Sequence, residues 1–216
     1  MQHAGTQQIN VVLDQSNHHV GSLYCVDWSR TERLIATGSN DRQIKLMVCP
    51  DLQQEQHDDI LEMTLQGHQA IVRTVCFDPT NDLVLLSGGQ IDQDVKVWNS
   101  ETGINVANLS GHQGDIHSIK MAQDGSFAIS VSTDKQILLF DIRCAKAVSK
   151  IDASEYPEMH DVALSSQQGQ IDTNQLRPQD MNSNSLSGSL NGFASIGHAD
   201  GSISIWNLYM RQCFAF

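Results

Sequence analysis

The sequence lacks the features that mark secreted and membrane proteins. Its 216 residues include only 4 prolines and 5 cysteines, and no two cysteines form a Cys-x-x-Cys pair. This odd, scattered set argues against a disulfide framework and a structural zinc site, so we expect buried free thiols. No apolar run approaches the roughly 20 residues of a membrane span, and residues 1–10 lack the basic start of a signal peptide. We therefore expect a soluble protein of the cytoplasm.

Positive charge is also scarce. The chain has 13 Lys and Arg against 25 Asp and Glu, a formal net charge of −12, and no basic stripe along it. Such a charge repels phosphate backbones and anionic lipid headgroups, so we expect neither nucleic acid nor membranes as partners. A chain of this length can bury about 70% of its unfolded surface, which is enough for a core without disulfides or metals.

A repeated block organises the chain. In four places an Asp in a Gly-, Ser- or Asn-containing turn precedes by six residues a large side chain that ends an alternating apolar and polar segment. The pairs are Asp41 and Met47, Asp92 and Trp98, Asp134 and Phe140, and Asp200 and Trp206. Alternation after a turn predicts a half-buried strand. Further strand patterns and the absence of helical periodicity predict an antiparallel all-β fold with four strands in each unit.

Three units also carry a histidine seven residues before a Val or Ile that opens another strand: His19, His68 and His112. Two of these histidines stand in the dipeptides Gly67-His68 and Gly111-His112. The pattern resembles the WD-repeat family of β-propellers, whose blades are four-stranded sheets of about 40 to 45 residues. The resemblance implies four blades, at 15–66, 67–110, 111–152 and 153–216, after an N-terminal strand segment at 1–14.

Two of the expected blades carry insertions, an acidic one at 51–59 and a Gln-, Ser- and Asn-rich one at 165–191 that we expect to be flexible. A ring of seven such blades would need about 290 residues. We therefore expect the four blades to belong to a larger ring, to pair with additional blades or to self-associate, because uncapped repeats expose apolar faces and sheet edges. A closed ring of four blades is the alternative.

In the family, a His, a Ser or Thr, an Asp and a Trp form a hydrogen-bonded tetrad in each blade. Carried over by position, the resemblance implies tetrad roles for His19, Thr37 and Asp41; His68, Asp92 and Trp98; His112, Ser130, Asp134 and, in place of Trp, Phe140; and Asp200 and Trp206. The positions that depart from the pattern are Met47 for Trp, Gly88 and Ile196 for the hydroxyl residue, and Glu155 for His. No unit is expected to hold a complete tetrad.

The sequence offers little for catalysis or metal binding. His112, Ser130 and Asp134 match the residue types of a catalytic triad, but the same positions recur in other units, which favours a structural role. His57, Asp58 and Asp59 are adjacent in the sequence, and we interpret them as a solvated acidic loop. Phosphate-binding loops, His-Glu-x-x-His and Gly-x-Ser-x-Gly motifs are missing. We expect no enzyme activity, no cofactor and no metal.

The resemblance also implies where partner proteins bind, since propellers present loop and strand-end residues at one rim. By repeat register these positions are Tyr24, Arg73, His117, His160 and Asn40. An aromatic residue and an Arg are typical of binding hot spots. The two histidines would make binding sensitive to pH if they contact a charged partner.

Two kinds of scaffold fit these features. The segment Ser16 to Lys45 is similar to the first propeller repeat of a microtubule-associated WD-repeat protein, which implies a cytoskeletal scaffold that acts through an adaptor, because the net charge opposes direct contact with the acidic microtubule. The alternative rests on the segment from Phe140 to Arg143, which is similar to the Trp-Asp-x-Arg box of WD-repeat substrate receptors of cullin-type ubiquitin ligases. Arg143 would then pair with the ligase adaptor.

Overall fold

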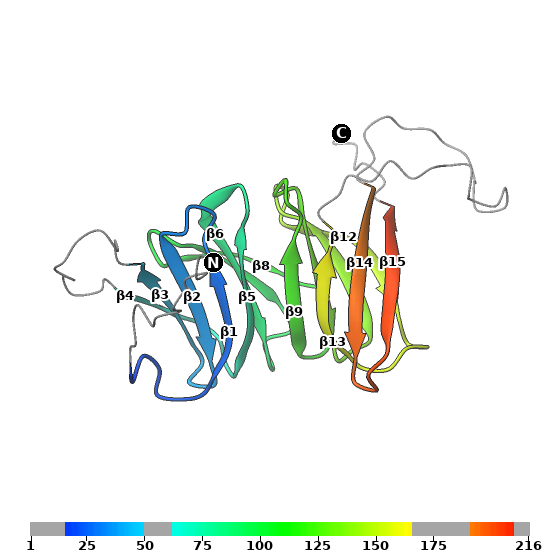
Figure 1. The fold of residues 1–216 in the computed structure, drawn as a ribbon, viewed down its shortest axis with the longest axis horizontal. Coiled ribbons are helices and arrows are strands. Elements are labelled where there is room, and N and C mark those ends of the chain that lie inside the picture. Colours follow the sequence, from blue (N-terminus) through cyan, green and yellow to red (C-terminus); the bar gives the residue numbers. More distant parts are fainter. Residues whose placement is uncertain (1–15, 50–61, 166–190, 210–216) are drawn as a thin grey trace, which may run out of the picture.

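The computed structural model describes residues 16–49, 62–165 and 191–209, and every regular element in these ranges is a β-strand (Figure 1). Among the residues that it describes, none forms a helix long and apolar enough to cross a bilayer. The N-terminal strand segment expected at 1–14, the acidic insertion at 51–59 and residues 166–190 of the second insertion lie outside the described residues.

The strands form four antiparallel sheets that follow one another along the chain. The first sheet has the order β1 (Leu23–Trp28), β2 (Leu34–Ser39), β3 (Gln43–Val48) and β4 (Glu62–Gln66). The second has the order β5 (Val72–Asp78), β6 (Asn81–Gly89), β7 (Val95–Asn99) and β8 (Asn105–Leu109).

The third and fourth sheets repeat this meander. The third contains β9 (Ile116–Met121), β10 (Phe127–Ser132), β11 (Gln136–Asp141) and β12 (Lys146–Asp152). The fourth contains three strands within the described residues, β13 (Met159–Leu164), β14 (Asn191–His198) and β15 (Ile203–Tyr209). Figure 1 shows the sheets side by side in chain order, from blue to red. The all-β propeller architecture is confirmed, and the four sheets do not close into a ring.

Each sheet has two faces, because side chains alternate across a strand. We call the face that carries Thr37, Ser87, Ser130 or Ile196 the front face and the opposite one the back face. The front face of each later sheet packs on the back face of the sheet before it, as in the cluster where Val75, Leu85 and Trp98 of the second sheet meet Ile44 and Leu46 of the first. Equivalent clusters join the second sheet to the third and the third to the fourth.

We call each contact between two neighbouring sheets a joint. Polar contacts between the first strands of neighbouring sheets reinforce the joints. β1 lies beside β5, β5 beside β9, and β9 beside β13. The backbone N–H of Phe77 donates to Asp27 Oδ2 at 2.7 Å, and the N–H of Ile119 donates to Thr74 Oγ1 at 3.2 Å. The Ser118 hydroxyl donates to Asp161 Oδ1 at 2.6 Å. The four first strands therefore form one continuous inner row, whose ends lie at a common rim.

Among the described strands, two sheet faces have no neighbouring sheet. On the front face of the first sheet, Leu23, Val26 and Trp28 are exposed, Val26 to 65%. On the back face of the fourth sheet, Ile203 and Ile205 are exposed, Ile205 to 73%. The open end faces thus carry the same apolar alternation that forms the core at the three joints.

Candidate protein-interaction surface

The second sheet contains a complete four-residue network behind the rim. The indole N–H of Trp98 donates to Ser87 Oγ at 2.7 Å, and Ser87 Oγ lies 2.6 Å from His68 Nε2. His68 Nδ1 lies 2.6 Å from Asp92 Oδ2. The hydrogens fit a single chain of donors, in which the indole donates to the hydroxyl, the hydroxyl to the imidazole and the imidazole to the carboxylate. The network is buried, and each of its polar groups has a hydrogen-bond partner. It therefore holds the turn that contains Asp92 in place against Trp98 on β7.

The expectation that Gly88 occupies the hydroxyl position, and that no unit is complete, is wrong. Counting four residues back from Asp92 reaches Gly88, but the turn before Asp92 has one more residue than its counterparts and contains Ile91 at a positive φ of 71°. Ser87 pairs with Val75 as Thr37 pairs with Val26, which places Ser87 at the hydroxyl position. Gly88 faces the third sheet, where an added Cβ would lie 2.7 Å from Ile116 Cγ2.

The third sheet has the same network without the indole. His112 Nε2 lies 2.6 Å from Ser130 Oγ, and His112 Nδ1 lies 3.0 Å from Asp134 Oδ2. Phe140 is fully buried in the place of Trp. Burial lowers the pKa of His112 against the opposing attraction of Asp134. Because Ser130 is itself fully buried, this triad-like set cannot reach a substrate from solvent and serves the packing of the sheet.

In the first sheet a second histidine joins the network. His19 lies 2.8 Å from Asp41 through Nδ1 and 2.9 Å from Thr37 Oγ1 through Nε2. His18 Nε2 also lies 2.8 Å from Thr37 Oγ1, and its Nδ1 lies 3.1 Å from Glu62. His18 therefore supplies the ring nitrogen that Trp98 supplies in the second sheet. Sequence reasoning chose His19 alone and missed His18, for which the His-His doublet was the available signal.

Each of the two histidines in the first sheet faces a carboxylate through Nδ1. Burial raises the pKa of Asp41, but hydrogen bonds from His19 and from two backbone N–H groups outweigh it and hold that pKa below its ordinary value. Lys45 similarly outweighs burial and lowers the pKa of Glu62. Both histidines therefore carry a proton on Nδ1, facing a carboxylate. Burial lowers the pKa of His19 against the opposing hydrogen bond and charge of Asp41. The Thr37 hydroxyl has a further acceptor besides the two rings, the carbonyl oxygen of Lys45 at 3.3 Å.

The fourth sheet has a different network from the expected one. Glu155, expected at the His position, is exposed, and Asp200 accepts the backbone N–H of Ser202 at 2.9 Å instead of binding a histidine. Ile196 does occupy the hydroxyl position, paired with Val162. A hydroxyl is supplied across the ladder by Ser204, the partner of Ile196 on β15.

Ser204 connects an indole to an imidazole as Ser87 does. Trp206 Nε1 donates to Ser204 Oγ at 2.7 Å, and Ser204 Oγ lies 2.8 Å from His198 Nε2. His198 Nδ1 lies 3.2 Å from the carbonyl oxygen of Pro157, and the Tyr156 ring stacks on His198 with centroids 5.7 Å apart. The Trp-hydroxyl-His connection is kept, while a backbone carbonyl replaces Asp.

The structure places the expected contact residues at one register position of the inner row. Tyr24, Arg73, His117 and His160 are each the second residue of the first strand of a sheet. The Arg73 guanidinium lies over the Tyr24 ring, 5.4 Å from its centroid, and joins the first two sheets. The rings of His117 and His160 lie 5.2 Å apart and join the last two. We call these four residues the rim row.

The other two expected contact residues lie apart from the rim row. Asn40 is exposed in the turn after β2, where its backbone N–H donates to the Ser22 carbonyl oxygen at 3.2 Å. Arg143 lies in the turn after β11, with its side chain 77% exposed. Its guanidinium donates to both carboxylate oxygens of Asp141, at 2.9 and 3.3 Å, and this contact lowers the pKa of Asp141. A partner that binds Arg143 would have to replace this ion pair.

The comparison with protein families decides the family. The family "WD domain, G-beta repeat" matches residues 10–46, 60–99 and 103–141, together more than half of the chain. The chain belongs to the WD40 repeat family. Proteins built from WD40 repeats are in general non-enzymatic scaffolds that bind other proteins, and the rim row is where this WD40 chain presents an aromatic, a cationic and two imidazole side chains together.

Two curated proteins illustrate the similarity. The nuclear distribution protein PAC1 of Komagataella phaffii is 35% identical over 106 residues, which cover 49% of this chain and 20% of that protein. The probable cytosolic iron-sulfur protein assembly protein 1 of Candida glabrata is 29% identical over 133 residues, 57% of this chain and 38% of that protein. The chain thus spans well under half of either relative. The narrower likeness of the first repeat to nemitin, a microtubule-associated protein, is not supported.

Proposed function

We propose that this WD40 chain is a non-enzymatic scaffold that binds a partner protein through the rim row. The observation that carries the proposal is the register equivalence of Tyr24, Arg73, His117 and His160 on four adjacent strands. Tyr and Arg are enriched in binding hot spots, and Arg73 is already held in place by its contact with Tyr24. A partner with acidic and apolar groups fits this row.

Affinity purification from cells with quantitative mass spectrometry tests the proposal. Tyr24→Ala and Arg73→Ala should each deplete the same partner severalfold, because both remove one element of a single contact. Arg30→Ala is the matched control, since Arg30 is an exposed arginine in the turn after β1, away from the rim row. A partner set unchanged by Tyr24→Ala and Arg73→Ala would refute the proposal.

For the cellular setting we propose a link to the microtubule cytoskeleton through an adaptor. The name of the first relative, a nuclear distribution protein, supports a role in positioning within the cell. The net charge of −12 opposes direct contact with the acidic microtubule surface. The purified chain should therefore co-sediment with microtubules only after cell extract is added, and failure to co-sediment in both conditions would contradict the link.

The second candidate is a substrate receptor of a cullin-type ubiquitin ligase, which the exposed Arg143 favours. Arg143→Ala should then abolish co-purification of the ligase adaptor, while Lys146→Ala, which removes a nearby cation at the start of β12, should not. Under the cytoskeletal proposal, both variants keep their partners.

We also propose that copies of the chain associate head to tail through the two open end faces. Each joint inside the molecule pairs a front face with a back face, and the open faces are one of each kind. Val26 and Trp28 on one copy and Ile203 and Ile205 on the next would then meet as their counterparts do at the joints. Such a heterologous contact either closes into a ring or continues as a chain.

A further inference from the structure

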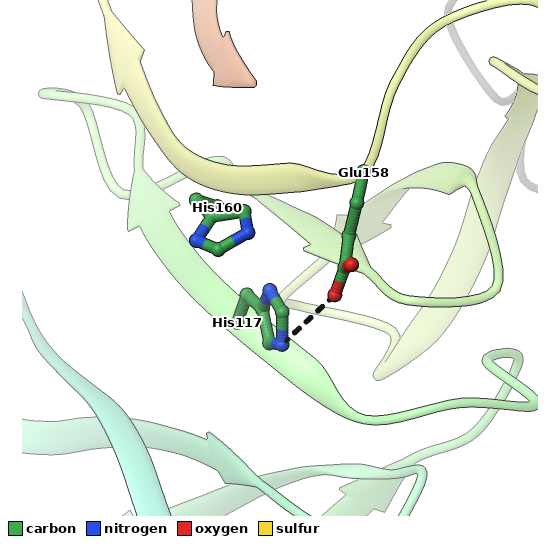
Figure 2. Close-up of side chains that lie close together, drawn as sticks. All are labelled: His117, Glu158 and His160. Carbon is green, nitrogen blue, oxygen red and sulfur yellow. Dashed lines mark ion pairs between the residues drawn. The ribbon is translucent and has the colours of Figure 1, made fainter. Parts of the chain in front are cut away.

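Three side chains at the joint between the third and fourth sheets converge on one point. His117 comes from β9, while Glu158 and His160 flank Met159 at the start of β13. Figure 2 shows the two imidazole rings and the carboxylate facing one another across the joint. One potential ligand atom from each residue lies within 4.8 Å of the other two, and His117 Nε2 lies 3.8 Å from Glu158 Oε1.

The backbone fixes which nitrogen of His117 is free to bind an ion. His117 Nδ1 lies 2.9 Å from the carbonyl oxygen of Met159, which can only accept, so Nδ1 carries the hydrogen. In the neutral ring the lone pair is then on Nε2, the atom that faces Glu158. An imidazole that donates its other N–H to a backbone carbonyl is the usual state of a metal-bound histidine. With its side chain 10% exposed, His117 is also held nearly rigid.

We propose that His117, Glu158 and His160 bind a divalent transition-metal ion of the zinc class across this joint. Two imidazole nitrogens and one carboxylate are a donor set that such ions prefer, whereas Ca²⁺ and Mg²⁺ take oxygen ligands. Tetrahedral zinc with these bond lengths holds its ligand atoms about 3.3 Å apart. The three ligand atoms now lie within 4.8 Å of one another, and rotations of the exposed Glu158 and His160 side chains about the fixed His117 bring them to that spacing.

Bound there, the ion has two consequences. It ties β9 of the third sheet to β13 of the fourth, so the joint becomes more stable when the ion is present. Three protein ligands also leave one tetrahedral position open for water or for a side chain of a partner. The inference revises the expectation of no metal, which considered His57, Asp58 and Asp59 and the cysteines but not histidines from different repeats. It stands on geometry alone and does not depend on the proposed function.

Titration of the purified chain with Zn²⁺ by isothermal calorimetry tests the site. His160→Gln and Glu158→Gln change exposed side chains and should leave the fold intact, yet each should weaken Zn²⁺ binding by about tenfold or more. Glu155→Gln is the matched control, because it removes the same charge from an exposed residue of the same segment. His117→Gln is less informative, since it also removes the hydrogen bond to Met159.

Co²⁺ distinguishes this site from the cysteines. Bound by nitrogen and oxygen, Co²⁺ should show visible d–d bands without the near-ultraviolet absorption of a Co²⁺–thiolate bond, and Mg²⁺ should not compete. The proposal is overturned if Zn²⁺ does not bind, if both variants bind it as tightly as the wild-type chain and Glu155→Gln, or if the Co²⁺ spectrum is that of thiolate ligands.

Discussion

Trp98 and Trp28 show how differently the same side chain serves two parts of this molecule. Trp98, on the front face of the second sheet, packs on the first sheet, donates to Ser87 and is 1% exposed. Trp28, on the front face of the first sheet, has none of the described strands packed in front of it and is 49% exposed. The alternating strand pattern specifies which face is apolar, but a neighbouring sheet decides whether that face is core or contact surface.

The largest expected effect is the difference in stability between alanine variants of these two tryptophans. Trp98→Ala removes a buried indole and leaves Ser87 without its donor, so we expect a loss of about 3–5 kcal/mol in the free energy of unfolding. Trp28→Ala should change stability by less than about 0.5 kcal/mol but weaken association of copies. Urea denaturation followed by circular dichroism measures the first quantity. Equal losses of stability for both variants would contradict the distinction between joint and open face.

A smaller effect should show which residue of the second sheet is the hydroxyl member of the network. Ser87→Ala leaves the Trp98 indole N–H and His68 Nε2 without their partner, at a cost of about 1–3 kcal/mol. The same substitution at the exposed Ser22 should cost almost nothing. Comparing the urea midpoints of the two variants checks this, and an equally stable Ser87→Ala protein would disprove the network.

Gly88 lies beside Ser87 on β6 but on the back face of the second sheet, so its substitution tests the packing against the third sheet. Because an added Cβ would lie 2.7 Å from Ile116 Cγ2 and 2.9 Å from Ile119 Cδ1, Gly88→Ala overpacks the joint with the third sheet. We expect a loss of about 1–3 kcal/mol, visible as a lower melting temperature. Gly192→Ala, at a position with open space around the glycine, is the control. A Gly88→Ala protein as stable as the control would mean that the joint is looser than described.

The pH dependence of stability should come from the buried networks. Since burial lowers the pKa of His112 in the folded protein, the unfolded chain binds a proton more readily, and stability is lost as the pH falls below about 6.5. The pKa of Asp134 is lowered as well, where hydrogen bonds from Gln113, Gln136 and His112 outweigh desolvation, so a further loss follows in more acidic solution.

Denaturation at pH 7.5 and pH 5.5 measures this loss, which amounts to about 1.4 kcal/mol for each unit by which the pKa is lowered. In His112→Gln the titrating ring is gone, so the difference between the two pH values should shrink. A difference as large as in the wild-type chain would assign the pH dependence to other groups.

The sequence predicts the strands well, because apolar alternation after an Asp turn depends only on neighbouring residues. It predicts the networks less well for reasons that the structure makes plain. The extra residue in the turn before Asp92 shifts the count, so the sequence pattern assigns the hydroxyl position to Gly88 instead of Ser87. The Ser204 hydroxyl reaches His198 from β15, which is not the strand that supplies the hydroxyl in the other repeats. The cluster of His117, Glu158 and His160 spans two repeats, so positions within one repeat do not predict it.

The molar mass of the purified chain in solution, measured by light scattering after size exclusion, tests the central claim that the open faces are contact surfaces. We predict a species heavier than the 23.8 kDa chain, and its return to that mass in Ile205→Glu, which places a charge on the open back face. Lys150→Glu, a charge change on the third sheet outside both end faces, should leave the larger species intact. A wild-type chain of 23.8 kDa across the concentration range would contradict the claim.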